Sequence, residues 1–117
     1  MKLFLSGPCT GQPLMNYPHF NSTAAELRAR GYEVVNPAEL CADIGDDWLA
    51  CMERCSQELV KCDAIAMLYG WQDSKGARRE QEQAASRGIP TYSAYQLSQH
   101  LASNLIALQV RGEVIAR

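Results

Sequence analysis

The chain has 117 residues, enough for one domain with its own core, and 47% of them are hydrophobic against 21% charged. A net charge of −2 at pH 7 excludes the large basic surface that holds DNA or RNA, so no nucleic-acid polymer is expected as a partner. No apolar run approaches the roughly 20 residues of a membrane helix, and the N-terminus lacks a signal peptide's cleavage site. We therefore expect a cytoplasmic protein without membrane contact.

The first part of the chain predicts a strand, a helix and a second strand. An apolar run at 2–5 ends in a glycine-containing loop, which is typical of a buried strand. Apolar residues at helical spacing then predict a helix over 16–31, with Asn16 as its cap. A second strand is predicted at 32–37, where a proline stops it, and a turn-rich connection follows over 38–47.

The second part repeats this alternation. Helical spacing returns over 48–62, and the continuous apolar run at 64–70 is typical of a central strand covered on both faces. The stretch 73–90 predicts a turn, a helix and the entry to a fourth strand at 90–94. A last helix is predicted at 94–104.

The alternation predicts the fold class: α/β, a single-domain three-layer sandwich with an open parallel sheet of four to five strands, Rossmann/flavodoxin-like. We expect one domain over 1–117, in which the apolar segment 104–117 serves as an oligomerisation tail. Ligands of open parallel sheets bind at the carboxyl ends of the strands. The loops 6–11, 36–40 and 70–76 should therefore meet at one edge.

The cysteines are odd in number, and without a signal peptide this favours reduced thiols. Three of them share the helix predicted at 48–62, at spacings that match no CxxC pair, and both histidines are remote in sequence. Buried structural thiols are therefore expected, with no metal and no cofactor. The five cysteines are Cys9, Cys41, Cys51, Cys55 and Cys62.

Two loops supply candidate ligand contacts. In the first, Ser6, Gly7 and Thr10 suit an anion near the backbone, although a tight turn explains the glycine equally well. The loop matches neither the Walker pattern nor GxGxxG. In the later loop, Asp73 or Ser74 caps the next helix or helps to bind a phosphate at its N-terminus. Trp71 either stacks on a base or packs in the core.

Glu80 is an unusual charge. Ala77, Ala84 and Gly88 form a narrow apolar stripe on the predicted helix, and Glu80 lies on or beside this stripe. Its stem packs while its head reaches solvent or a neighbouring arginine, or else its carboxylate points into a site as nucleophile or base. The pattern leaves both interpretations open.

The segments 1–11, 30–40, 62–71 and 74–90 together resemble the DUF4406 proteins, which are relatives of the nucleoside 2-deoxyribosyltransferase superfamily. The resemblance covers residues 1 to about 93. It matches Gly76, Glu80 and Ala84 to a G-x-x-x-E-x-x-x-A helix. This implies that Glu80 is a nucleophile that forms a covalent deoxyribosyl–enzyme intermediate, which water hydrolyses or a second base accepts.

The resemblance also implies that Ser74 binds a 5′-phosphate and that Gly7, Pro8 and Thr10 hold the sugar or phosphate. The superfamily places an assisting aspartate eight residues before the aspartate that opens the central strand, where this chain has Cys55. A neutral thiol is a poor substitute for that acid, and Asp73 is the other catalytic candidate.

Two functions follow from these patterns. The chain either cleaves or exchanges the N-glycosidic bond of a small nucleoside or nucleotide, or it is a nucleotide-binding module that has lost efficient chemistry. A scaffold whose loops bind nothing specific is the third alternative. Because relatives assemble as dimers or larger oligomers, the resemblance also implies a homodimer or higher homo-oligomer.

Overall fold

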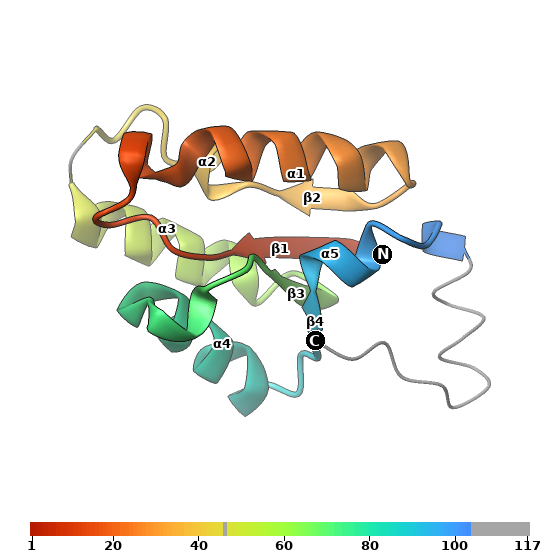
Figure 1. The fold of residues 1–117 in the computed structure, drawn as a ribbon. Coiled ribbons are helices and arrows are strands. Elements are labelled where there is room, and N and C mark those ends of the chain that lie inside the picture. The colour runs from red at the N-terminus through yellow and green to blue at the C-terminus, as the bar shows by residue number, and fades with distance from the viewer. Residues whose placement is uncertain (46, 104–117) are drawn as a thin grey trace.

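A computed structural model describes residues 1–45 and 47–103 of the chain (Figure 1). The strands are β1 Lys2–Ser6, β2 Glu33–Val35, β3 Ala64–Met67 and β4 Thr91–Ser93. The helices are α1 Tyr17–Ala29, α2 Pro37–Leu40, α3 Trp48–Leu59, α4 Lys75–Ser86 and α5 Ala94–Leu97, with short 3₁₀ turns η1 Pro13–Asn16 and η2 Trp71–Asp73. The predicted oligomerisation tail at 104–117 lies outside the described residues.

The strands form one parallel sheet in the order β2-β1-β3-β4. The predicted α/β class with an open parallel sheet is therefore confirmed, with four strands among the described residues. β1 continues through α1 to β2 on one side, whereas β3 continues through α4 to β4 on the other. The direction of winding thus reverses between β1 and β3, and open sheets of this kind bind ligands at the carboxyl ends of the two strands at such a point.

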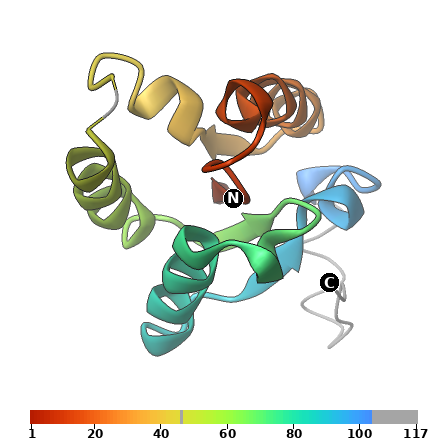
Figure 2. The same ribbon diagram turned by 60° about the vertical axis from the view of Figure 1, so that its left-hand side comes forward.

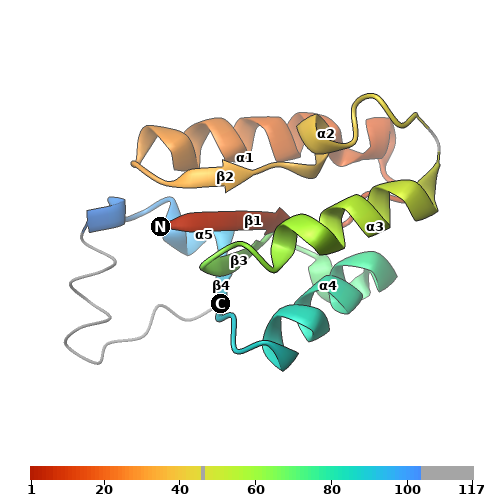
Figure 3. The same ribbon diagram turned by 180° about the vertical axis from the view of Figure 1, so that it is seen from behind.

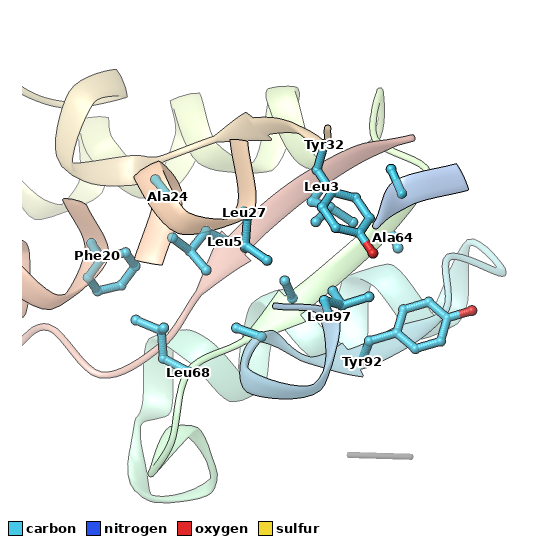
Figure 4. Packing of buried hydrophobic residues seen from close by; sticks show 13 residues of the cluster. Leu3, Leu5, Phe20, Ala24, Leu27, Tyr32, Ala64, Leu68, Tyr92 and Leu97 are labelled. Carbon is cyan, nitrogen blue, oxygen red and sulfur yellow. The ribbon is translucent and has the colours of Figure 1, made fainter. Parts of the chain in front are cut away.

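Helices cover both faces of the sheet (Figure 2). On one face, α1 and α5 pack against Leu3 and Leu5, and Figure 4 shows Phe20 and Leu27 of α1 in this cluster. On the opposite face, α3 and α4 pack together (Figure 3), and Phe4 contributes to their cluster. Period-two alternation along β1 therefore directs Ser6 towards the same side as Phe4, which is the side of α4.

The caps explain where two of these helices begin. The Asp47 side chain accepts a hydrogen bond from the Ala50 amide at the start of α3. Ser74 does the same for Ala77 at the start of α4. Asn16 occupies the cap position of α1 but makes no capping bond, so that part of the prediction is wrong. Its amide donates instead to the Pro8 carbonyl, 2.9 Å away, and ties the first loop to the helix.

The last predicted helix is too long. α5 ends at Leu97 rather than near residue 104, because tertiary contacts hold the chain beyond it. The Ala102 amide donates to the Arg30 carbonyl at 2.9 Å, and the Tyr32 hydroxyl donates to the His100 carbonyl at 3.4 Å. Across the described residues, no helix has the length and apolar character that crossing a membrane requires.

The expectation of fully reduced thiols is also wrong, because Cys41 and Cys51 form a disulfide. Cys41 follows α2 and Cys51 lies in the first turn of α3, and their Cα atoms are 5.5 Å apart, within the range that a disulfide spans. The other cysteines are free, and two of these, Cys55 and Cys62, are buried as predicted.

Candidate functional site

The Ser6 hydroxyl donates a 2.6 Å hydrogen bond to Oε1 of Glu80. Ser6 is the last residue of β1 and is fully buried, and Glu80 lies on the sheet-facing side of α4 with only 8% of its surface exposed. The carboxyl group therefore does not extend into solvent, and within the described residues it forms no ion pair. The bond joins the end of a central strand to the second turn of the helix beside it.

Burial raises the pKa of Glu80 to about 7, because removing a carboxylate from water disfavours its charged form. The hydrogen bond from Ser6 lowers the pKa and so offsets part of this effect. At neutral pH the carboxyl group is thus divided between its acid and its carboxylate. A carboxyl with such a pKa can accept or donate a proton near neutrality, which is a property of catalytic groups.

Two thiols, Cys9 and Cys55, lie near this carboxyl, and the phenol of Tyr17 lies near the two thiols. Burial, together with a smaller effect of the nearby charge of Glu80, raises the pKa of Cys9 to about 11 and that of Cys55 to about 12. Burial also raises the pKa of Tyr17, with smaller contributions from Cys9 and Cys55. Cys9 lies in the first loop, Tyr17 at the start of α1, Cys55 in α3 and Glu80 in α4. Both thiols keep their protons at neutral pH.

Cys55 therefore faces Glu80 from α3. This is the position where the resemblance expected an aspartate, and burial makes the thiol a weaker acid than a free cysteine. Asp73, the other catalytic candidate, is exposed at the end of η2 and lines a neighbouring hollow.

The first and third loops meet in a hollow of about 270 Å³ at the carboxyl ends of β1 and β3. We call this the small hollow. Its lining residues are Pro8, Thr10, Gln12, Tyr69, Gly70, Asp73 and Ser74. Four predicted site residues, Pro8, Thr10, Asp73 and Ser74, are thus brought together, but Glu80 is not part of its wall. The predicted second loop is absent too, because Asn36 is buried and caps α2.

A larger hollow of about 940 Å³ lies between α1, α5 and the loop that follows β3, and it shares Tyr69 and Gly70 with the small hollow. Its walls include His19, Glu26 and Trp71, but neither Ser74 nor Glu80. By volume alone, this larger hollow would be the candidate site. We place the candidate site at the small hollow instead, because its first loop continues directly from Ser6, which holds Glu80, and because the N-terminus of α4 borders it.

The family model for a domain of unknown function, DUF4406, matches residues 1–92. The chain belongs to the DUF4406 family. The match includes both loops of the small hollow, Ser6 and the whole of α4, so the candidate site lies inside the family domain. No curated protein matches the chain.

The glycines of this DUF4406 domain have different roles. A Cβ on Gly7 would lie 2.6 Å from the Leu68 Cβ, so the first loop needs glycine to pass close to the end of β3. Packing thus accounts for Gly7 without a ligand. At Gly76 the nearest atom to an added Cβ is the Met52 sulfur at 3.9 Å, an ordinary contact. Neighbouring atoms therefore leave room for a side chain at Gly76.

Three residues of the DUF4406 site were not predicted from the sequence. Cys9 and Tyr17 carry no motif; the path of the first loop brings Cys9 near Glu80 and Tyr17 near Cys9 and Cys55. Tyr69 is 96% exposed and lines both hollows, whereas Trp71, the predicted stacking residue, packs partly against the core and lines only the larger one. Tyr69 directly follows the buried Leu68 at the end of the apolar run, and this position near the carboxyl end of a strand was the sequence signal that could have identified it.

Proposed function

We propose that this DUF4406 chain acts on the N-glycosidic bond of a deoxynucleoside or its 5′-monophosphate, with Glu80 as the nucleophile. The observation that carries the proposal is the buried Glu80 carboxyl, held by Ser6 where the winding of the sheet reverses. The resemblance of Gly76, Glu80 and Ala84 to the nucleophile helix of the 2-deoxyribosyltransferase superfamily supports the same assignment.

In the proposed reaction, an ionised oxygen of Glu80 attacks the anomeric carbon of the deoxyribose. The bond from that carbon to the base breaks, and its electron pair leaves with the base, which takes up a proton. Water then attacks the same carbon, which releases the sugar and restores the carboxylate. A second base in place of water completes a transfer instead. Ser6 fixes one carboxyl oxygen and so sets the direction in which the other points.

The small hollow supports binding of a 5′-phosphate. Ser74 lines it at the N-terminus of α4, where a helix of 12 residues directs its first amides and its dipole outward. Thr10 adds a hydroxyl group from the first loop, and Tyr69 offers an exposed ring on which a base can stack. A deoxynucleoside monophosphate has a chemical partner for each of these groups.

The second candidate function is a nucleotide-binding module without efficient catalysis. Two observations favour it: Glu80 does not line the small hollow, and the group that faces it from α3 is the neutral thiol of Cys55. In this alternative the small hollow binds the nucleotide and Glu80 remains a buried structural acid.

Incubation of the full chain with each of the four deoxynucleoside monophosphates, followed by chromatography of the free bases, separates the two functions. We expect slow base release that Glu80→Gln abolishes. The matched control is Glu82→Gln, since Glu82 lies on the same helix but is exposed. Calorimetric binding with no base release from any substrate would establish the binding module, and full turnover in Glu80→Gln would remove Glu80 from the mechanism.

Cys55→Asp tests the proposed role of the residue that faces Glu80. We expect the variant to release base faster than the natural chain, because a carboxyl group then assists departure of the base. The control is Ser56→Asp, which introduces the same carboxyl group at the neighbouring position of α3. A folded Cys55→Asp variant with an unchanged rate would contradict the assignment of this position.

Assembly as a homodimer or larger oligomer remains part of the proposal. Light scattering of the chain with and without residues 104–117 tests it, and an unchanged monomeric mass in both would contradict it.

A further inference from the structure

Three cysteine sulfurs gather between α2 and α3. Cys41 follows α2, while Cys51 and Cys55 lie one helical turn apart on α3. Their Sγ atoms all lie within 4.8 Å of one another. We call these three residues the thiol triad. Among the described residues, this is the only set of three or more histidine, cysteine or acidic side chains whose ligand atoms lie close enough for one metal ion.

The spacing of these sulfurs is close to that in a metal–thiolate site. Sulfurs that bind one Zn²⁺ tetrahedrally at about 2.3 Å lie about 3.8 Å from one another. The Cys55 Sγ lies 3.8 Å from the Cys41 Sγ and 4.0 Å from the Cys51 Sγ. Two of the three sulfur–sulfur separations therefore already suit a shared ion. The third pair, Cys41 and Cys51, is covalently bonded in the disulfide, and its two sulfurs move apart when that bond is reduced.

We propose that the reduced thiol triad binds one Zn²⁺ ion through three thiolates, with a solvent molecule in the fourth position. Thiolates select soft and borderline ions such as Zn²⁺ over Mg²⁺ or Ca²⁺. Cys41 and Cys55 are almost fully buried, whereas Cys51 is partly exposed and leaves a side for solvent to approach. The site adjoins the surroundings of Glu80, because Cys55 belongs to both.

Metal binding requires that the disulfide is first reduced. A phosphine supplies two electrons to the Cys41–Cys51 disulfide and becomes the phosphine oxide with the oxygen of a water molecule, whose two protons go to the thiols. Binding of Zn²⁺ then releases three thiol protons, so the occupied triad carries a net charge of −1. Arg54 lies beside the triad, where its guanidinium donates to the carbonyl of Leu40, the residue before Cys41, and pairs with Asp43 at 2.6 Å, so Asp43 already offsets part of its charge.

The other two cysteines provide controls. Cys62 donates its thiol to the Glu58 carbonyl, and Cys9 donates to the Gly7 carbonyl. Neither belongs to the thiol triad. In the sequence, the spacing within one predicted helix brings together only Cys51, Cys55 and Cys62, and that spacing does not suggest a metal site. In the fold, Cys41 from a different element lies beside Cys51 and Cys55, whereas Cys62 is not part of this cluster.

The test is a titration of the full chain, reduced with a phosphine and kept free of oxygen, with Co²⁺ as a coloured substitute for Zn²⁺. We expect one equivalent to bind with a thiolate-to-cobalt charge-transfer band that Zn²⁺ removes. Cys55→Ser should weaken binding at least about tenfold, since even indirect contacts to a metal are worth 10- to 100-fold in affinity. Cys62→Ser should bind like the natural chain, and the oxidised chain should not bind.

A second measurement needs no variant. Alkylation of the reduced chain with and without Zn²⁺, read by mass spectrometry, should show protection of Cys41, Cys51 and Cys55 but not of Cys9 or Cys62. The proposal is overturned if the reduced chain gives no charge-transfer band, if Cys55→Ser binds as the natural chain does, or if Zn²⁺ protects no member of the triad.

Discussion

Replacing the buried Glu80 with glutamine should make the stability of the protein less dependent on pH. The folded chain holds the pKa of Glu80 at about 7, whereas an unfolded glutamate has its ordinary value of 4.5. Between these values the folded state binds more protons than the unfolded state, so the free energy of unfolding falls as pH rises through this window. Well below pH 4.5 the carboxyl group is protonated in both states, so its burial no longer lowers the free energy of unfolding through its charge.

The size of the effect follows from the same interval. At about 1.4 kcal/mol for each pKa unit, a carboxyl moved from 4.5 to about 7 costs about 3 kcal/mol of stability once pH exceeds the folded value. The side chain is almost fully buried, so solvent screening reduces this little. Glu80→Gln keeps the shape and an oxygen for Ser6 but carries no charge.

Urea denaturation of both proteins at pH 5 and pH 8, followed by tryptophan fluorescence, measures this difference. Part of the penalty is already present at pH 5, so we expect Glu80→Gln to gain about 2.5 kcal/mol relative to the natural chain on going from the lower to the higher pH. All other titrating groups are common to the two proteins and cancel in the comparison. Glu82→Gln, on the exposed side of α4, should show no such change. A stability difference that is the same at both pH values would refute the reasoning.

Three further changes test the hydrogen bond from Ser6 and the packing at two glycines. Ser6→Ala removes the donor that lowers the pKa of Glu80, so that pKa should rise above about 7 in a carbon-13 NMR titration, and an unchanged or lower value would contradict the hydrogen bond. Gly7→Ala forces a Cβ to within 2.6 Å of the Leu68 Cβ and should cost about 1–3 kcal/mol in thermal denaturation. Gly76→Ala should be neutral or stabilising by up to about 1 kcal/mol, and equal losses at both glycines would count against the packing argument.

The strands could be predicted from the sequence because their signals are local. The apolar runs, the prolines and the glycines that end them, and the alternation with helical spacing all lie within a few residues of each other. This information suffices for a parallel α/β sheet. It does not place the end of α5, because bonds to Arg30 and from Tyr32, distant in the sequence, hold the segment that follows.

The candidate site was predictable only in part for the same reason. The stripe beside Glu80 indicated that it lies near the core, but whether its head reaches solvent depends on Ser6, which is 74 residues away in sequence. The disulfide and the thiol triad depend on Cys41, whose partners lie on a different helix. Local spacing cannot reveal contacts that the fold creates between elements.

The two ends of the described chain lie at the same edge of the sheet, opposite the small hollow (Figure 1). The Met1 carbonyl accepts from Glu33 at the start of β2, and Ala102 is bonded to Arg30 just before that strand. A surface tether attached through the N-terminus would therefore leave the carboxyl ends of β1 and β3 facing free solution. Immobilised protein is thus suited to measuring nucleotide capture at the small hollow.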